Sequence, residues 1–255
     1  MEDSQPATQQ PVGAAAVQSE NSLIKDLLIP ISIVLAGIAI GVGLYFSGGP
    51  AQPQAVNPSG APAAAQADNT GLVNEVTDQD NVKGNLNGDI KIVEFSDFDC
   101  VFCARFHDTM NEIVAENTDV AWAYRHFPIE QLHPQATAVA VASECVAKIG
   151  GNDAFWIFAD GYFAAKSAGA QVALDVLVPE LVAAAGVESG AFASCFENGE
   201  TLAQVQEDVD NATATGGRGT PWSILIGPSG KTYPINGALP KQAVEQLIEL
   251  ARQEA

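Results

Sequence analysis

The chain has 255 residues, of which 47% are hydrophobic and 16% charged, and its 31 acidic and 11 basic side chains give a formal net charge of −20. A polyanion repels phosphate backbones, so this balance argues against nucleic-acid binding, and it equally disfavours electrostatic docking on anionic lipid. The length leaves room for one sizeable domain with a buried core and for additional segments.

An uncharged run of twenty residues, Leu27–Phe46, dominates the N-terminal part of the chain. As a helix it rises about 1.5 Å per residue, which is enough to cross a hydrocarbon core of about 30 Å. The run exceeds the apolar region of a signal peptide, so we interpret it as an uncleaved membrane anchor. Lys25 precedes the run and the next basic residue is Lys83. This bias predicts a cytoplasmic N-terminus and an extracytoplasmic remainder at the cell membrane.

The segments beside this anchor lack the apolar residues of a folded core. The tail is polar, and the segment after the anchor is rich in Pro, Ala and Gln, a composition typical of linkers. We therefore expect a disordered tail (1–22), a transmembrane anchor (23–46), a linker (47–70) and a folded domain (71–255).

Strand and helix patterns alternate within the folded domain. In chain order we expect a strand at 89–96, a helix at 100–116 with Asp99 as its N-cap, a strand at 120–126, a helical stretch at about 134–215, a hairpin with strands at 222–226 and 231–235, and an amphipathic helix at 241–253. Glycines near 150, 169, 186 and 199 are expected to interrupt the helical stretch.

Cys100 and Cys103 form a C-x-x-C motif where the first predicted strand gives way to a helix. At a helix N-terminus, unsatisfied N–H groups and the helix dipole favour thiolate over thiol, so Cys100 is the expected attacking group. Cys103 lies one turn later and can resolve a mixed disulfide. The alternative is half of a zinc site, which needs a second pair of ligands at short spacing. Because no such pair follows, we favour redox chemistry and expect neither a metal nor a cofactor.

Two further features lie where a redox site needs them. Glu94 stands six residues before Cys100 on the preceding strand, where a buried carboxylate could accept the proton of Cys103. The alternative is an acid that faces solvent. Thr220 and Pro221 follow a glycine-rich turn, and a cis bond between them would bring the backbone against the dithiol and present Thr220 to an extended substrate chain. The alternative is a proline that merely begins a strand.

The segment Val93–Cys103 (VEFSDFDCVFC) resembles the active-site region of the DsbA-like thiol–disulfide oxidoreductases of the thioredoxin superfamily. Residues 124–128 (YRHFP), 132–134 (LHP) and 219–221 (GTP) share this resemblance, which covers about residues 78–255. It implies an α/β thioredoxin fold with an inserted helical subdomain, here preceded by one transmembrane helix. It also implies that Cys100 attacks, that Cys103 resolves and that Pro221 is the cis-proline.

The residues between the cysteines, Val101 and Phe102, depart from the family pattern of proline followed by a histidine or aromatic residue. We expect both to contact substrate together with Thr220. They supply no cation to lower the pKa of Cys100, so the oxidising strength of the site stays open. His107 lies two turns from Cys100 on the same helix, and we expect it at the surface; the alternative is that it partly substitutes for the missing cation.

Cys145 and Cys195 remain after the local pair is assigned, and both fall in the helical stretch. In an extracytoplasmic domain they can form a structural disulfide, and a bridge closing such a loop contributes about 4 kcal/mol. The alternative is two small buried thiols.

These observations predict an extracytoplasmic oxidoreductase that exchanges disulfides with cysteine-containing secreted or membrane proteins, in the direction of disulfide formation. The family resemblance implies a membrane redox partner that recycles it. A reductase or isomerase is the alternative within the enzyme class. A tethered binding or metal-chaperone module that holds Cu(I) is the alternative from another class, and the scarcity of methionine, Met1 and Met110 only, argues against it.

Overall fold

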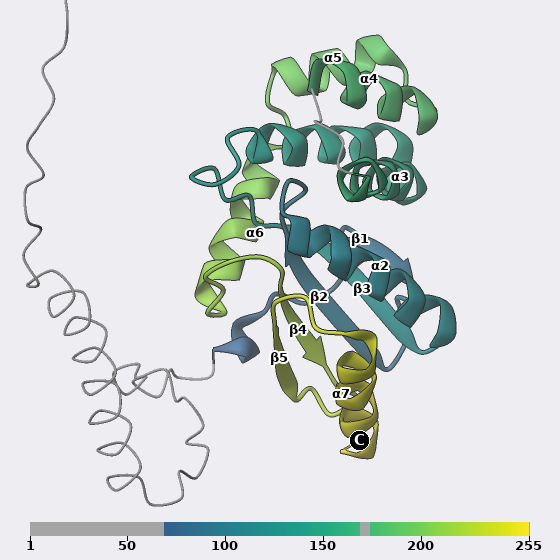
Figure 1. The fold of residues 1–255 in the computed structure, drawn as a ribbon, viewed down its shortest axis with the longest axis vertical. Helices are drawn as coiled ribbons and strands as arrows, with labels where there is room; N and C mark the ends of the chain where they lie inside the picture. The colour runs from purple at the N-terminus through teal and green to yellow at the C-terminus, as the bar shows by residue number, and fades with distance from the viewer. Residues whose placement is uncertain (1–68, 169–173, 255) are drawn as a thin grey trace, which may run out of the picture. The chain divides into compact units, whose positions relative to one another are not determined.

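The computed structural model describes residues 69–168 and 174–254. A five-stranded sheet in the order β1-β3-β2-β4-β5 forms its frame (Figure 1). Strands β2 and β3 are parallel, and the other neighbouring pairs are antiparallel. The strands are β1 (Asn81–Gly84), β2 (Ile90–Ser96), β3 (Val120–His126), β4 (Trp222–Ile226) and β5 (Thr232–Asn236). The helices are the short 3-10 helix η1 (Thr70–Leu72), α2 (Val101–Glu116), α3 (Ala136–Ser167), α4 (Leu174–Ala184), α5 (Ser189–Glu197), α6 (Leu202–Ala214) and α7 (Lys241–Gln253).

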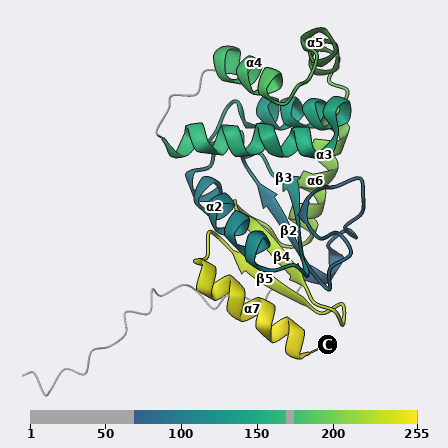
Figure 2. The same ribbon diagram turned by 90° about the vertical axis from the view of Figure 1, so that its right-hand side faces the viewer.

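The two faces of the sheet are covered by different helices. Figure 2 shows α2 and α7 on one side and α6 on the other. Successive residues of a strand point to opposite faces. Ile90 and Ile92 of β2 accordingly join the main core beneath α2, α3 and α7, whereas Val93 and Phe95 pack in a smaller core with Ala212 of α6. The same alternation of side chains along β2 places Glu94 and Ser96 on the side of the main core.

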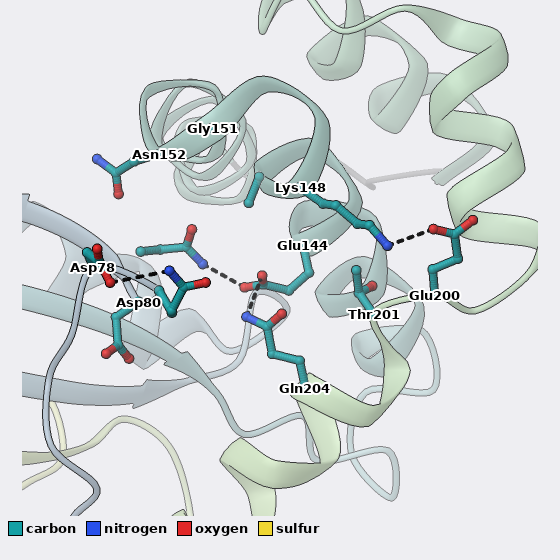
Figure 3. A pocket seen from close by; sticks show the side chains of 12 residues that line it. Asp78, Asp80, Glu144, Lys148, Gly151, Asn152, Glu200, Thr201 and Gln204 are labelled. Atoms are coloured by element: carbon teal, nitrogen blue, oxygen red, sulfur yellow. Dashed lines mark hydrogen bonds and ion pairs between the residues drawn. The ribbon is translucent and has the colours of Figure 1, made fainter.

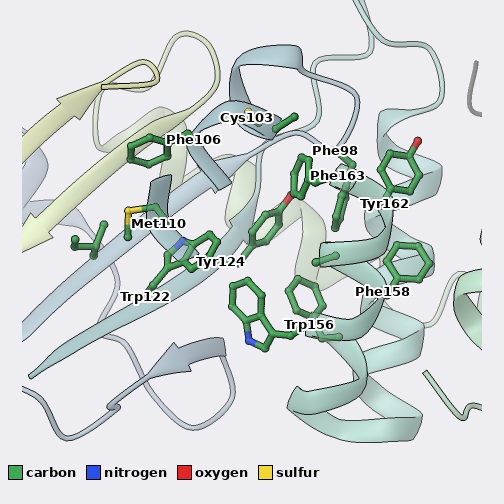
Figure 4. Packing of buried hydrophobic residues seen from close by; sticks show 14 of the residues in the cluster. Phe98, Cys103, Phe106, Met110, Trp122, Tyr124, Trp156, Phe158, Tyr162 and Phe163 are labelled. Carbon is green, nitrogen blue, oxygen red and sulfur yellow. The ribbon is translucent and has the colours of Figure 1, made fainter. Parts of the chain in front are cut away.

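The main core is unusually aromatic, and it reaches the end of α2 that carries the cysteines. Phe98 lies at its centre, with ring centroids 5.2 Å from Tyr124 and 5.0 Å from Phe163. Figure 4 shows these rings together with Cys103, which is one of the fully buried members of the cluster. The loop between β2 and α2 is therefore held from below by packing, which gives the C-x-x-C motif a rigid base.

The inserted helices α3 to α6 connect β3 to β4, and α3, α4 and α5 stack beyond the edge of the sheet in Figure 1. Gly151 interrupts α3 with φ 80° and ψ −176°, a conformation that non-glycine residues avoid. Cys145 of α3 and Cys195 of α5 are joined by a disulfide, with an S–S distance of 2.00 Å and a Cα–Cα distance of 5.8 Å. The covalent link holds the outer helices against the long central one.

Strand β1 is an element that the sequence patterns did not predict. Its four residues, Asn81–Gly84, have no alternating apolar pattern, and they form a strand by pairing with β3 at the edge of the sheet. The predicted tail, anchor and most of the predicted linker lie outside the described residues. Within the described ranges, no helix combines the length and the apolar character that a membrane crossing requires.

Candidate active site

Cys100 is the N-cap residue of α2, and its sulfur lies 3.5 Å from the carbonyl oxygen of Thr220. The pKa of Cys100 is lowered to about 5. The chief cause is a hydrogen bond from the Cys103 thiol, and the Thr220 side chain and the N–H groups of Cys103 and Phe102 add to it, while burial acts in the opposite direction. At neutral pH, Cys100 is therefore a thiolate, the form that attacks disulfides.

Cys103 lies one turn into α2, is fully buried, and is a free thiol like Cys100. Burial raises the pKa of Cys103 well above its usual value, and the charges of Cys100 and Glu94 raise it further. The backbone N–H of Asp97 lies 3.5 Å from its sulfur and donates to it. The two cysteines thus have pKa values displaced in opposite directions, so Cys100 is charged while Cys103 keeps its proton.

Glu94 is fully buried on the core side of β2, so the alternative of an acid facing solvent is wrong. The Ser96 hydroxyl donates to its Oε1 at 2.7 Å, and the Trp122 indole donates to its Oε2 at 2.9 Å. Burial raises the pKa of Glu94 to about 8, against the opposing effect of these two bonds. The charge of Glu94 raises the pKa of Cys103, and the Ser96 hydroxyl, which also bonds Glu94, lowers it, so both groups act on the buried thiol.

The Thr220–Pro221 peptide bond is cis. The carbonyl oxygen of Pro221 accepts a hydrogen bond from the N–H of Gly237 at 3.0 Å, which ties this turn to the residue after β5. The carbonyl of Thr220 faces Cys100, as described above. The turn therefore presents backbone atoms directly opposite the first cysteine.

A cavity of about 340 Å³ opens beside Cys100, and we call it the cysteine groove. It is lined by Cys100, Val101, Phe102, Ile129, Leu132, His133, Arg218, Gly219 and Thr220. Three of its apolar side chains are exposed: Val101 by 58%, Phe102 by 52% and Leu132 by 70%. Single exposed apolar residues are ordinary, but three beside a reactive sulfur form a continuous contact surface for a chain that approaches it.

Asp97 holds the far wall of the cysteine groove in place. Its Oδ2 accepts hydrogen bonds from the N–H of Ile129 at 2.8 Å and from Nδ1 of His133 at 2.9 Å. Its Oδ1 accepts from the N–H of Asp99 at 2.8 Å. One buried carboxylate thus connects the loop before α2 to the loop before α3, and His133 has a structural role in the wall of the groove.

The structure corrects the prediction for Asp99, which does not cap α2. The helix begins at Val101, and its N-cap residue is Cys100. The Asp99 carboxylate instead accepts from the Tyr162 hydroxyl at 3.1 Å and from Lys166 at 3.0 Å. These partners come from α3, so the competing contact is tertiary and could not be seen in the local pattern.

The surface position predicted for His107 is also wrong, because its side chain is buried. Its Nε2 lies 2.7 Å from Asp160, and its ring packs 5.1 Å from Trp122 and 4.5 Å from Phe163. Burial lowers the pKa of His107. His107 therefore does not take the place of the cation that the motif lacks.

Three residues of the site were not singled out from the sequence: Ser96, Asp97 and Trp122. A hydroxyl and a carboxylate directly after a buried apolar strand are a usable signal, because a polar group in that position needs an internal partner. Trp122 has no such signal, since its contact with Glu94 depends on the parallel register in which Ile92 faces Trp122.

A larger, polar hollow of about 490 Å³ lies away from the cysteines, between β1, α3 and α6 (Figure 3). Glu144 at its base accepts hydrogen bonds from Asn81 at 2.6 Å and Gln204 at 2.8 Å. His126 lies 2.7 Å from the same carboxylate. None of the twelve residues that line this hollow is a cysteine. The Glu144 carboxylate bonds side chains of β1, β3 and α6, so its role here is structural.

Comparison with known proteins identifies the fold. A family model described as Thioredoxin matches residues 76–246. DsbA2 of Pseudomonas aeruginosa superposes with a TM-score of 0.61 at 22% identity, covering 71% of this chain and 98% of that one. Oxidised BdbD of Bacillus subtilis superposes with a TM-score of 0.57 at 19% identity, covering 68% and 92%.

A stretch of 87 residues, 34% of this chain, is also 38% identical to the Na(+)/H(+) antiporter NhaA 1 of Mycolicibacterium vanbaalenii. The match covers 14% of the antiporter, so the chain corresponds to a small part of that protein. Since the family model spans most of the described residues, the chain belongs to the thioredoxin family, and its superposition on DsbA2 gives it the DsbA-like form of that fold.

Proposed function

We propose that this protein is an extracytoplasmic thiol–disulfide oxidoreductase that forms disulfides in cysteine-containing secreted or membrane proteins. The observation that carries the proposal is the opposite displacement of the two cysteine pKa values, with Cys100 lowered to about 5 and Cys103 raised. A stabilised thiolate stabilises the reduced enzyme, and an enzyme with a stable reduced form is an oxidant when its cysteines are joined.

The reaction begins from the Cys100–Cys103 disulfide. A substrate thiolate attacks the sulfur of Cys100, which breaks the enzyme disulfide and forms a mixed disulfide. Cys103 leaves as a thiolate and takes a proton from Glu94, whose pKa of about 8 leaves it mostly protonated at neutral pH. A second substrate thiolate then attacks the substrate sulfur of the mixed disulfide and displaces Cys100 as a thiolate. The substrate loses two electrons and the enzyme gains them.

Substrate contacts are assigned to Val101, Phe102 and Thr220 in this proposal. The exposure of the first two and the position of Thr220 opposite the sulfur support it. An extended substrate chain can lie along the cis-proline turn with its backbone paired to Thr220, while its apolar side chains cover the exposed residues. Residue 221 presents no N–H group at this turn, because proline has none.

The reduced enzyme needs reoxidation, and we assign this step to a membrane redox partner. A membrane anchor at residues 23–46 would keep the domain near such a partner. The disulfide between Cys145 and Cys195 supports an extracytoplasmic location, since structural disulfides persist in oxidising compartments. Digestion of spheroplasts, in which only the inner membrane remains closed, by an added protease tests this location: loss of the domain is expected, and its protection would place it in the cytoplasm.

The reduction potential tests the direction of the reaction. The full-length chain is equilibrated in glutathione buffers, and the fraction of free Cys100 is measured by alkylation. A pKa of about 5 lies between the values of about 3.5 in DsbA and about 7 in thioredoxin, so we expect a potential between about −120 and −270 mV. A potential more positive than about −180 mV supports disulfide formation, and one near −270 mV indicates a reductase.

A matched pair of variants completes this test. Cys103→Ala is expected to accumulate mixed disulfides with substrate at Cys100, because the resolving thiol is gone. Cys100→Ala is expected to form none, since the remaining thiol is buried. If the unaltered chain shows no reversible titration at all, the oxidoreductase proposal fails and a binding module remains.

A further inference from the structure

The basic side chains of this acidic protein are mostly neutralised by carboxylates. Ion pairs are formed by Lys83, Arg125, Lys148, Lys166, Lys231, Lys241 and Arg252. Among the Lys and Arg residues in the described ranges, those without a carboxylate partner are Lys91, Arg105 and Arg218. In a chain with 31 acidic residues, an unpaired guanidinium group needs a reason.

Two of these three cations lie at the cysteine groove. Arg218 is exposed and lines the groove together with Cys100 and Thr220. Arg105 is exposed on α2, and its guanidinium carbon lies 4.7 Å from the centre of the Phe102 ring, which lines the same groove. An arginine stacked on an aromatic ring keeps its N–H groups free to bind an anion.

The groove itself contains no carboxylate among its nine lining residues. Of the acids near the groove in sequence, Asp97 and Asp99 have partners within the fold, and Glu130 is exposed next to Ile129 in the chain. Asp97 is bound by His133 and by backbone N–H groups, and Asp99 is paired with Lys166. The mouth of the groove is therefore locally cationic on a protein whose net charge is −20.

We propose that the cysteine groove selects substrate chains that carry Asp or Glu next to the reacting cysteine, with Arg218 and Arg105 binding those carboxylates. The inference rests on the proposed exchange reaction and names its substrate class. At physiological salt, charges further away than about 8 Å are largely screened, so the two nearby arginines outweigh the distant acidic surface. Arginine also pairs with carboxylates through two parallel hydrogen bonds, which adds specificity.

The experiment compares three peptides with the full-length oxidised protein. Each peptide carries two cysteines in one sequence, and the residues beside the cysteines are Glu, Gln or Lys. The second-order rate constant for oxidation of each peptide by the protein is divided by the rate constant for the reaction of the same peptide with the neutral 2-hydroxyethyl disulfide. This division removes the effect of neighbouring charge on the pKa of the peptide thiols. An exposed ion pair is worth about threefold. We therefore expect the Glu peptide to exceed the Gln peptide by about threefold to tenfold at low salt, with the ratio falling at 0.5 M salt as expected for screening.

Three variants assign the effect. Arg218→Gln and Arg105→Gln are each expected to lower the ratio of Glu to Gln peptide rates, and the double variant to bring it near one. Lys91→Gln removes the same charge at the opposite end of β2 from the cysteines and is expected to leave the ratio unchanged.

Equal normalised rates for all three peptides would overturn the inference and leave the proposed function standing. A preference for Glu that persists in the double variant would overturn the assignment to these arginines. Failure of the protein to oxidise any of the peptides would overturn the proposed function, and the inference with it.

Discussion

The buried carboxyl of Glu94 has a measurable cost in stability. Its neighbours Ser96 and Trp122 are neutral, so no cation offsets its charge when it ionises. The pKa of Glu94 is about 8 in the folded protein and near the ordinary 4.5 in the unfolded chain. The folded state therefore favours the protonated form. The protein is most stable below pH 4.5 with respect to this group and loses that contribution as the pH rises towards 8.

The loss follows from about 1.4 kcal/mol per pKa unit and amounts to roughly 3 kcal/mol at pH 7. Glu94→Gln removes the charge but keeps an oxygen that can accept from Trp122 and an amide that can donate to Ser96. We expect this variant to be more stable than the unaltered protein by about 3 kcal/mol at pH 7 and equal to it near pH 4.

Urea denaturation of both proteins, fully reduced with a phosphine, at pH 4, 5.5, 7 and 8 measures this difference. Glu130→Gln is the control, because Glu130 is exposed in a loop and its replacement should change little at any pH. A difference between Glu94→Gln and the unaltered protein that stays constant with pH would refute the reasoning. So would a variant that is less stable at pH 7.

Three further predictions test other parts of the structure. Alkylation of reduced Cys100 should follow a titration with a midpoint near pH 5, and a midpoint near 8.5, that of a free cysteine, would contradict the lowered pKa. Replacing Cys145 and Cys195 together by Ala should lower the free energy of unfolding by about 4 kcal/mol, because their bridge spans 50 residues; a loss below about 1 kcal/mol in urea titration would disagree. Gly151→Ala should lower the free energy of unfolding by about 1–3 kcal/mol in the same titration, because φ at this residue is 80° with ψ −176°. Gly71 has equally open space around it, so Gly71→Ala is the control and should cost less than about 1 kcal/mol. Similar costs for the two variants would show that the backbone angle is unimportant.

The local pattern was enough for the elements whose structure depends on nearby residues. The patterns of β2 and β3, the turn residues between β4 and β5, and the amphipathic pattern of α7 led to bounds within a residue or so of those observed. The C-x-x-C motif at a strand–helix junction also pointed to Cys100 as the residue at the helix N-terminus, where the structure places it as N-cap, because this position follows from the local pattern. Assigning two of the four cysteines to the C-x-x-C motif left Cys145 and Cys195, which form the disulfide between α3 and α5.

Other features depend on contacts between segments far apart in the chain. Strand β1 exists through its pairing with β3. Asp99 and His107 were misplaced because their partners, Lys166 and Asp160, lie on α3, more than fifty residues later. Local patterns carry no information about which distant side chain competes for a hydrogen bond.

The chemistry of the site divides in the same way. Residue types and spacing led to the groups that the proposed exchange reaction uses. Their pKa values depend on burial and on neighbours such as Trp122, which the parallel register of β2 and β3 brings to Glu94. The cationic mouth of the groove likewise arises because folding brings Arg218 into the wall of the groove and Arg105 against the Phe102 ring. Burial and long-range pairing are properties of the packed molecule, and they set the charge of each group in it.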